Sequence, residues 1–240
     1  MKVNIDPIQE EKRKAALEAV KHVKDGFIVG LGSGSTAAFA IEALGERIKR
    51  EKLCVMGIPT SYQAFLLAVQ SGIPITTLDE HPQINMTIDG ADQVTPELNL
   101  IKGMGAAMAR EKIVAAASDL NIIIVDEKKK VKLLGENNQV VPIEVLPFAI
   151  SLAKRKIVDA GGKPILREGK GKLGPVITDN GNAILDSYFG EIMRPGELEV
   201  KMKMIPGVIE TGFFVGLTDI AYVGTREAVE KLEKVMLTRL

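Results

Sequence analysis

A glycine-rich loop early in the chain is the first segment whose residues could do chemistry. Residues 32–36 read GSGST and follow a short apolar run at 27–29. Glycines let a ligand approach the backbone, and unpaired amides at the start of a helix attract an anion. The loop therefore predicts a phosphate site, and the alternative is a plain strand-to-helix turn capped by Ser or Thr. The predicted anion ligands are Ser33, Gly34, Ser35 and Thr36.

The same loop excludes two nucleotide-binding motifs. It lacks the Gly-Lys-Ser/Thr ending of the NTPase phosphate loop. Its glycines do not follow the G-x-G-x-x-G spacing, and the second predicted strand, residues 53–58, ends without an acid to hold a ribose. A phosphate monoester fits the loop better than a nucleotide.

A pair of acids follows another apolar run. Asp89 and Asp92 lie three residues apart just beyond residues 84–88, where the carboxyl end of a parallel strand meets a ligand crevice. The alternative is a turn in which Asp caps the chain. The two acids do not indicate a metal, because the only histidines, His22 and His81, lie in no ligand-spaced pattern.

A third cluster holds a lysine and a glutamate that could transfer a proton. Lys102 precedes a second glycine-bearing helix start, and Glu111 lies two turns into an alanine-rich helix predicted over residues 106–117. Partial burial would raise the pKa of Glu111 and make it a stronger proton acceptor. The alternative is a solvated helix face on which Glu111 pairs with a basic residue. The run at 125–130, which includes Lys129, is either a solvated turn or part of the same sheet edge.

The elements that must position these residues alternate between strands and helices. Apolar runs alternating with helical patterns argue for a parallel sheet covered on both faces, so the chain is predicted to be an α/β protein with a Rossmann-like domain. The predicted strands are residues 27–29, 53–58, 73–78, 84–88, 122–125 and 220–223.

A second unit is indicated after Lys130, where proline and glycine become frequent. Strands at 175–178 and 182–187 flank the Asn-Gly pair of a hairpin turn. Helical patterns over residues 146–160 and 197–204 complete a small α+β unit. We expect residues 1–134 and 208–240 to form the Rossmann-like catalytic domain and residues 135–207 the small α+β domain, with a charged terminal helix from Thr225.

Composition narrows the function classes. The 240 residues carry 31 basic and 31 acidic side chains, and this zero net charge gives no drive toward nucleic acid or an anionic membrane. The polar start of the chain predicts no signal peptide, and no apolar run is long enough to cross a bilayer. The single cysteine, Cys54, is expected to be a small buried filler. These features predict a cytoplasmic protein.

Four ordered motifs together resemble ribose-5-phosphate isomerase of the A type. They are the 32–36 loop, residues 89–92 (DGAD), residues 102–112 (KGMGAAMAREK) and residues 176–186 (VITDNGNAILD). The resemblance runs from about residue 11 to residue 224. It implies a cofactor-free aldose–ketose isomerase that interconverts ribose 5-phosphate and ribulose 5-phosphate, and usually a homodimer or homotetramer.

The resemblance also implies roles for single residues. Glu111 would be the catalytic base, assisted by Asp89, Asp92 and Lys102, and Lys12 is a further candidate for substrate contact. The other implied substrate-binding residues are Gly90, Ala91, Gly103, Met104, Gly105 and Lys129. Met104 departs from the pattern, since many relatives have a third consecutive glycine there.

Two other functions stay open on the sequence alone. A sugar-phosphate-binding regulatory module would keep the phosphate loop without needing the Glu, Lys and Asp set. A CoA-transferase-like enzyme on a related fold would use a glutamate as nucleophile.

Overall fold

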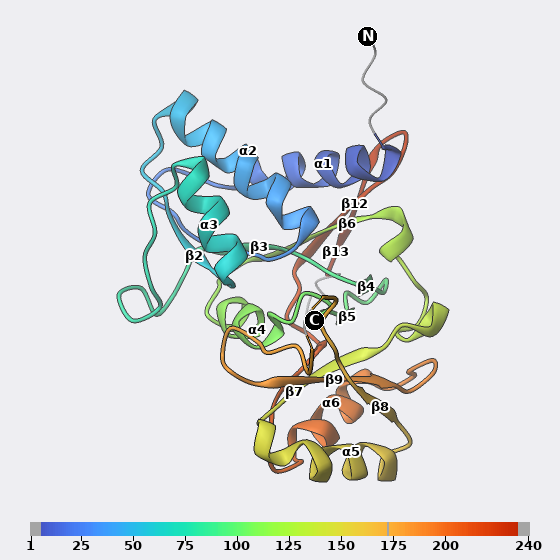
Figure 1. Cartoon of the computed structure of the whole chain (residues 1–240). Helices are drawn as coiled ribbons and strands as arrows, with labels where there is room; N and C mark the ends of the chain where they lie inside the picture. Colours follow the sequence, from blue (N-terminus) through green and yellow to red (C-terminus); the bar gives the residue numbers. More distant parts are fainter. Residues whose placement is uncertain (1–5, 172, 235–240) are drawn as a thin grey trace, which may run out of the picture.

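The computed structural model describes residues 6–171 and 173–234, and its centre is a six-stranded sheet (Figure 1). The strand order is β13-β12-β6-β3-β1-β2, in which only the β12–β13 pair is antiparallel. All residues of β1, β3, β6 and β12 are buried, as expected for strands covered on both faces. The strands are β1 (Ile28–Leu31), β2 (Met56–Pro59), β3 (Met86–Gly90), β6 (Asn121–Asp126), β12 (Ile220–Gly224) and β13 (Val229–Glu233).

Helices cover both faces of this sheet. On one face lie α1 (Pro7–Val20), α2 (Ser35–Glu51) and α3 (Tyr62–Ser71), and α4 (Met108–Ala116) lies on the other (Figure 1). Small residues on α1, such as Ala15 and Ala19, pack with α2 residues in a core that includes Ile41. This close packing fixes the two helices whose N-terminal halves border the predicted phosphate loop.

The chain also forms two antiparallel sheets. A three-stranded sheet consists of β4 (Gln93–Val94), β5 (Leu100–Ile101) and β11 (Phe213–Phe214). The four-stranded sheet, ordered β10-β7-β9-β8, consists of β7 (Val141–Val145), β8 (Lys163–Leu166), β9 (Ala183–Tyr188) and β10 (Val208–Thr211). Helices α5 (Ile150–Asp159) and α6 (Pro195–Lys203) lie against the latter (Figure 1). We call these four strands and two helices, together with the loops that join them, the small unit.

This architecture confirms the predicted fold class, a Rossmann-like parallel sheet with a smaller α+β part. The division of the chain at residues 134 and 208 stays a proposal. Strand β10, which begins at Val208, pairs with β7 in the small unit.

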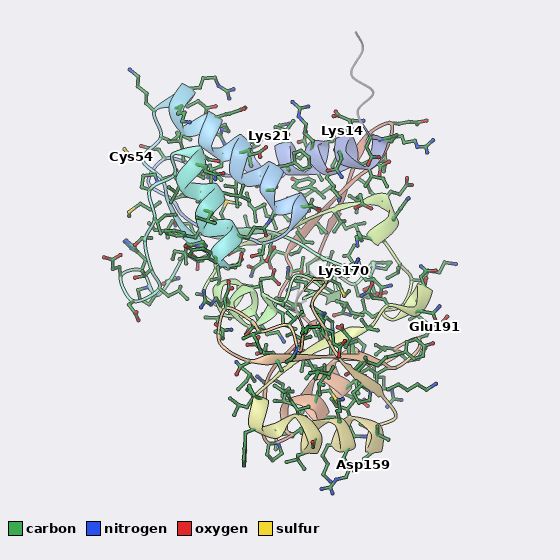
Figure 2. The ribbon with its side chains drawn as sticks, viewed as in Figure 1. Lys14, Lys21, Cys54, Asp159, Lys170 and Glu191 are labelled. Carbon is green, nitrogen blue, oxygen red and sulfur yellow. The ribbon has the colours of Figure 1, made fainter. Side chains whose placement is uncertain are left out.

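Four local predictions were wrong. The strand expected at 175–178 is not formed, and Pro175 and Ile177 form isolated bridges to Glu168 and Ala183. The expected helix from Thr225 is strand β13, because pairing with the free edge of β12 outweighs the helix preference of its charged residues; residues 235–240 of that segment lie outside the described residues. Cys54 is exposed at the surface (Figure 2), because the chain turns there between α2 and β2. Residues 73–78 contribute only a bridge from Ile75 to Gly57.

The sheet order creates a crevice above its centre. Strands β1 and β3 are neighbours in the sheet. Strand β2, which follows β1 in the chain, lies on one side of this pair, and β6, the next strand of this sheet after β3, lies on the other, so the chain leaves the carboxyl ends of β1 and β3 in opposite directions. Such a switch point is where open parallel sheets bind ligands. The 32–36 loop follows β1, and Asp89 and Gly90 end β3, so the fold brings two of the predicted motifs together.

Candidate active site

The 32–36 loop packs directly on the end of β3. The Ser33 amide donates to Asp89 Oδ1 at 3.0 Å. A side chain at Gly32 would clash with Asp89, so only glycine lets the two strand ends approach this closely. The Ser33 hydroxyl lies 2.8 Å from Thr60 Oγ1 and 2.6 Å from Ser61 Oγ. The loop is therefore held by residues beyond β2 that sequence reasoning missed.

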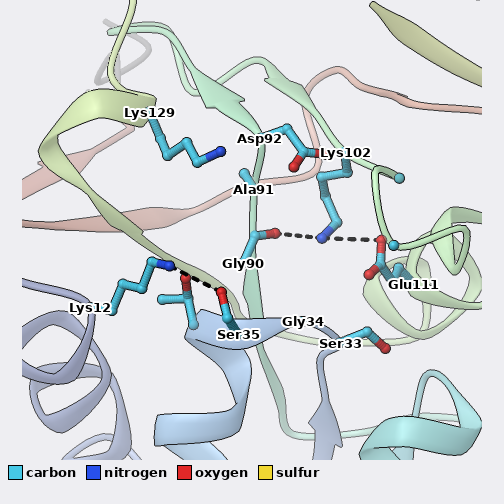
Figure 3. A pocket seen from close by; sticks show the side chains of 13 residues that line it. Lys12, Ser33, Gly34, Ser35, Gly90, Ala91, Asp92, Lys102, Glu111 and Lys129 are labelled. Atoms are coloured by element: carbon cyan, nitrogen blue, oxygen red, sulfur yellow. Dashed lines mark hydrogen bonds and ion pairs between the residues drawn. The ribbon is translucent and has the colours of Figure 1, made fainter. Parts of the chain in front are cut away.

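Helix α2 begins at this loop with its amide end open. Its N-cap residue is Gly34, with φ at 96°, which has no side chain to cap the helix, and the Gly34 amide donates to Gln63 Oε1 at 2.9 Å. The structure thus differs from the alternative in which a Ser or Thr hydroxyl caps the helix. Lys12 Nζ donates to Ser35 Oγ at 3.0 Å, and Lys129 also lines the crevice (Figure 3). A helix N-terminus between two ammonium groups is well suited to a phosphate.

A buried charged triad lies at the other end of the crevice. Lys102 Nζ lies 3.0 Å from Asp89 Oδ2. It also lies 3.2 Å from Glu111 Oε2 and donates to the Gly90 carbonyl (Figure 3). The exposed fractions of Asp89, Lys102 and Glu111 are 2%, 3% and 5%. Sequence reasoning left a solvated Glu111 open, and the structure contradicts that alternative.

Burial shifts the proton affinities of the triad. Burial raises the pKa of Glu111 to about 8, the charge of Asp89 adds to this, and Lys102 opposes it. Burial also raises the pKa of Asp89, against the opposing charge of Lys102 and the amides of Gly90 and Ser33. Burial alone would lower the pKa of Lys102, but the carboxylates of Asp89 and Glu111 outweigh it and raise that pKa. Because Asp89 accepts from two backbone amides as well as Lys102, we assign the exchangeable proton to Glu111.

The neighbours of Glu111 on α4 form their ion pairs and hydrogen bonds with the small unit. Lys112 Nζ lies 2.6 Å from Glu199 Oε1 and 2.8 Å from Glu210 Oε1. Arg110 Nε donates to Asn180 Oδ1 at 2.7 Å. Neither cation pairs with Glu111, so Lys102 is the cation beside it.

Asp92 and the loop after Lys102 form a wall of the crevice. Asp92 Oδ2 accepts a hydrogen bond from the Met104 amide at 3.0 Å. Arg167, which sequence reasoning missed, donates to the carbonyls of Gly103 and Met104 at 3.0 and 2.9 Å. Arg167 Nη2 also forms an ion pair with Asp186 Oδ1. Arg167 comes from the small unit, so only the tertiary fold could reveal this contact.

The crevice encloses a cavity of about 140 Å³, which brings most of the predicted residues together. Asp89 lies beneath its floor. Met104 does not line it, and its side chain is 47% exposed. Met104 instead supports the lining residue Asp92 through the hydrogen bond from its amide. The lining residues are Lys12, Ser33, Gly34, Ser35, Thr36, Gly90, Ala91, Asp92, Lys102, Gly103, Gly105, Glu111 and Lys129.

Comparison with known proteins assigns the chain to a family. The profile of ribose 5-phosphate isomerase A (phosphoriboisomerase A) matches residues 56–228. The chain belongs to the ribose 5-phosphate isomerase A family. Ribose-5-phosphate isomerase A of Methanothermobacter thermautotrophicus is 48% identical over 221 residues, which cover 92% of this chain and 96% of that protein. The Pyrococcus horikoshii protein of the same name is 47% identical over 228 residues, which cover 95% of this chain and 99% of that protein.

Solved structures of this family share the fold. Ribose 5-phosphate isomerase A from Methanocaldococcus jannaschii superimposes with a TM-score of 0.90 at 47% identity, covering 94% of this chain and 99% of that one. A D-ribose-5-phosphate isomerase in complex with phospho-erythronic acid gives a TM-score of 0.92 at 47% identity, covering 95% and 99%. The family predicted from four motifs is thereby confirmed.

Two negative findings hold for residues 6–171 and 173–234. No helix in these ranges is both long and apolar enough to cross a membrane. No group of three His, Cys, Asp or Glu side chains in the same ranges could hold a metal ion. The prediction that the reaction needs no metal and no cofactor stays a prediction.

Proposed function

We propose that the chain interconverts D-ribose 5-phosphate and D-ribulose 5-phosphate through an enediol, with Glu111 as the base. The observation that carries this proposal is the buried contact between Glu111 and Lys102, in a crevice whose other end suits a phosphate. A relative with a similar fold binds phospho-erythronic acid, a sugar-acid phosphate.

Glu111 moves a proton between adjacent carbons. Its carboxylate removes the proton from C2 of the open-chain aldose, and the electron pair forms the C1–C2 double bond as the C1 carbonyl oxygen gains a proton. Return of the proton to C1, with loss of the proton on the C2 hydroxyl, gives the ketose. A base with a pKa near 8 suits a transfer that must run in both directions.

Lys102 stabilises the charge that develops on oxygen. Its ammonium is fixed by Asp89 and by the Gly90 carbonyl, so it needs no reorganisation during the reaction. Such a preorganised donor contributes typically about 3 to 4 kcal/mol. Asp89 acts through Lys102 and through the Ser33 amide, and it is therefore a positioning residue.

Asp92 is the acid that we assign to ring opening. It lines the crevice, whereas Asp89 lies beneath Lys102 and is 2% exposed. A carboxylate at the wall can exchange a proton with the ring hydroxyl. The neighbouring backbone of Gly103 and Gly105 would contact the sugar.

The phosphate binds at the opposite end. The start of α2, with Ser35, Thr36 and Gly34, would hold it between Lys12 and Lys129. Anchoring one end of a flexible sugar converts binding energy into orientation at C1 and C2. Unphosphorylated ribose should therefore react poorly.

The test is an assay of the purified, chelator-treated protein with ribose 5-phosphate and with ribose. The proposal predicts ketose from the phosphate ester and little from ribose. Absence of ketose from ribose 5-phosphate would reject it. No observation favours the regulatory module, and a trapped glutamyl thioester would be needed to favour the CoA-transferase-like reaction.

Assembly and location follow from the family resemblance alone. We propose a homodimer or homotetramer in the cytoplasm, with no nucleic-acid or membrane partner. Light scattering of the purified protein tests the oligomeric state, and cell fractionation tests the location.

A further inference from the structure

A tight turn in the small unit, residues 178–182, is built on a fully buried glutamate. Glu144 of β7 is 0% exposed, and its Oε1 accepts three hydrogen bonds. The donors are Thr178 Oγ1 at 2.8 Å, Asn180 Nδ2 at 3.1 Å and Asn182 Nδ2 at 2.8 Å. Burying a carboxylate is costly unless such donors compensate for its lost hydration. The network therefore holds the 178–182 turn in one conformation.

One outer side of the turn contacts the helix that carries the base. Arg110 Nε donates to Asn180 Oδ1 at 2.7 Å, and Arg110 Nη2 donates to the Asp179 carbonyl at 2.9 Å. Arg110 directly precedes Glu111 in the first turn of α4. The guanidinium makes two bonds to one rigid turn, which fixes both its distance and its direction.

The same turn also contacts the helix that supports the phosphate loop. Asp179 Oδ2 accepts from the Tyr62 amide, the first residue of α3, at 2.8 Å. From this helix end, Ser61 contacts the Ser33 hydroxyl and Gln63 Oε1 accepts from the Gly34 amide at 2.9 Å. The turn therefore has separate contacts to the two ends of the crevice.

We propose that the 178–182 turn positions the base and the phosphate loop relative to each other. The inference rests on the proposed function, because it assigns Glu111 and the loop their roles. Asp179 and Asn180 are exposed at the tip of the turn, so the packing of the small unit does not require their outward contacts. Displacing a reacting group by about 1 Å can lower a rate by about 100-fold, so an exposed contact far from the substrate can matter.

The Arg110 contact is tested through kcat. In Arg110→Met and in Asn180→Ala we expect kcat to fall about tenfold with KM within about twofold, because the base is displaced while the phosphate loop is unchanged. Arg110→Met removes the bonds to Asn180 Oδ1 and to the Asp179 carbonyl, whereas Asn180→Ala removes the bond from Arg110 and also one donor to Glu144. The double variant should therefore lose less than the sum of the two single losses, because the Arg110–Asn180 bond is common to both. Arg194→Met, which breaks the exposed Arg194–Glu197 pair at the start of α6, is the matched control.

The Asp179 contact is tested through binding. Asp179→Ala should raise KM for ribose 5-phosphate and the inhibition constant of inorganic phosphate about three- to tenfold, with kcat nearly unchanged. Arg110→Met should leave the inhibition constant of phosphate unchanged. A merely structural role of the turn would change both parameters together in both variants.

Two substitutions of Glu144 test whether its hydrogen bonds hold the turn. Glu144→Gln keeps an oxygen for the three donors and should retain kcat and KM within about twofold, whereas Glu144→Leu should impair both. If Glu144→Leu does not fold, the Arg110, Asn180 and Asp179 variants decide the matter, since Asp179 and Asn180 are exposed and Arg110 is half-buried.

The outcomes separate the two proposals. An unmutated protein without isomerase activity would reject the proposed function. An active protein that is silenced by Glu111→Gln, but in which folded Arg110→Met keeps kcat within about twofold, would reject the positioning role alone.

Discussion

The two ends of the crevice are built in opposite ways. The phosphate end uses backbone amides, hydroxyls and two lysines that solvent can reach, whereas the chemical end uses three charged side chains that are at least 95% buried. Binding a dianion needs many modest donors, but moving a carbon-bound proton needs one strongly perturbed base. Within the crevice, the buried charged side chains are the ones whose pKa values are shifted.

The largest expected effect is at the buried end. Glu111→Gln keeps the shape of the side chain and removes the base, so kcat should fall about 10²- to 10⁴-fold while the fold persists. Steady-state assays measure this, with the exposed Glu42→Gln on α2 as the control. Near-normal turnover of Glu111→Gln would remove Glu111 from its role.

Lys102→Met should have the next largest effect. Removing the ammonium leaves no cation beside the reacting oxygen, so kcat should fall about 10²- to 10³-fold and KM should rise. Circular dichroism checks that the variant folds, because breaking a buried ion pair costs about 3 to 5 kcal/mol. An unchanged kcat would deny Lys102 a part in stabilising the transition state.

The burial of Glu111 should also lower stability at high pH. The folded protein holds the Glu111 proton up to about pH 8, whereas an ordinary glutamate loses it near 4.5. The free energy of unfolding should therefore fall as pH rises through this window, and Glu111→Gln should gain about 2 to 4 kcal/mol over the unmutated protein by pH 8. Urea titrations at pH 5 and pH 8 measure the difference. An equal difference at both pH values would contradict the raised pKa.

The pH–rate profile reports the same pKa in the active protein. Because Glu111 acts as a base only when it is deprotonated, kcat/KM should rise about 50-fold between pH 6 and pH 8 and then level off. A profile that is flat over this range would place the base pKa well below 8.

A substitution at the phosphate end should have the smallest effect on the kinetics. Ser35→Ala removes one hydroxyl near the start of α2, so KM should rise about tenfold or less with kcat nearly unchanged. Kinetics with ribose 5-phosphate at fixed ionic strength measure it. A loss confined to kcat would contradict the assignment of binding to the phosphate end and of proton transfer to the chemical end.

Sequence patterns predicted the parts of the site that lie at strand and helix ends. The 32–36 loop, Asp89 and Asp92 follow apolar runs, and the order of these runs indicated a parallel sheet with its ligand crevice. The periodicity of apolar residues was enough to predict these strands and helices, because each has its own hydrophobic pattern in the sequence. The four motifs then predicted the family, and Glu111 and Lys102 as its catalytic pair.

Contacts between distant segments could not be predicted. Ser61, Arg167 and Glu144 lie in segments without a local motif for their roles, and they reach the site or its supports only through tertiary packing. The 229–233 strand and exposed Cys54 were missed for the same reason, since edge pairing and chain direction override local preference.

The most direct test of Glu111 as the base measures the incorporation of deuterium from heavy water into the product. Ribose 5-phosphate is incubated in D₂O with the unmutated protein and with folded Glu111→Gln, and deuterium at C1 of the ketose is followed by NMR. We expect deuterated ketose from the unmutated protein and a rate at least about 100-fold lower from the variant. Deuterium incorporation by Glu111→Gln at the unmutated rate would contradict the claim that this buried carboxylate moves the proton.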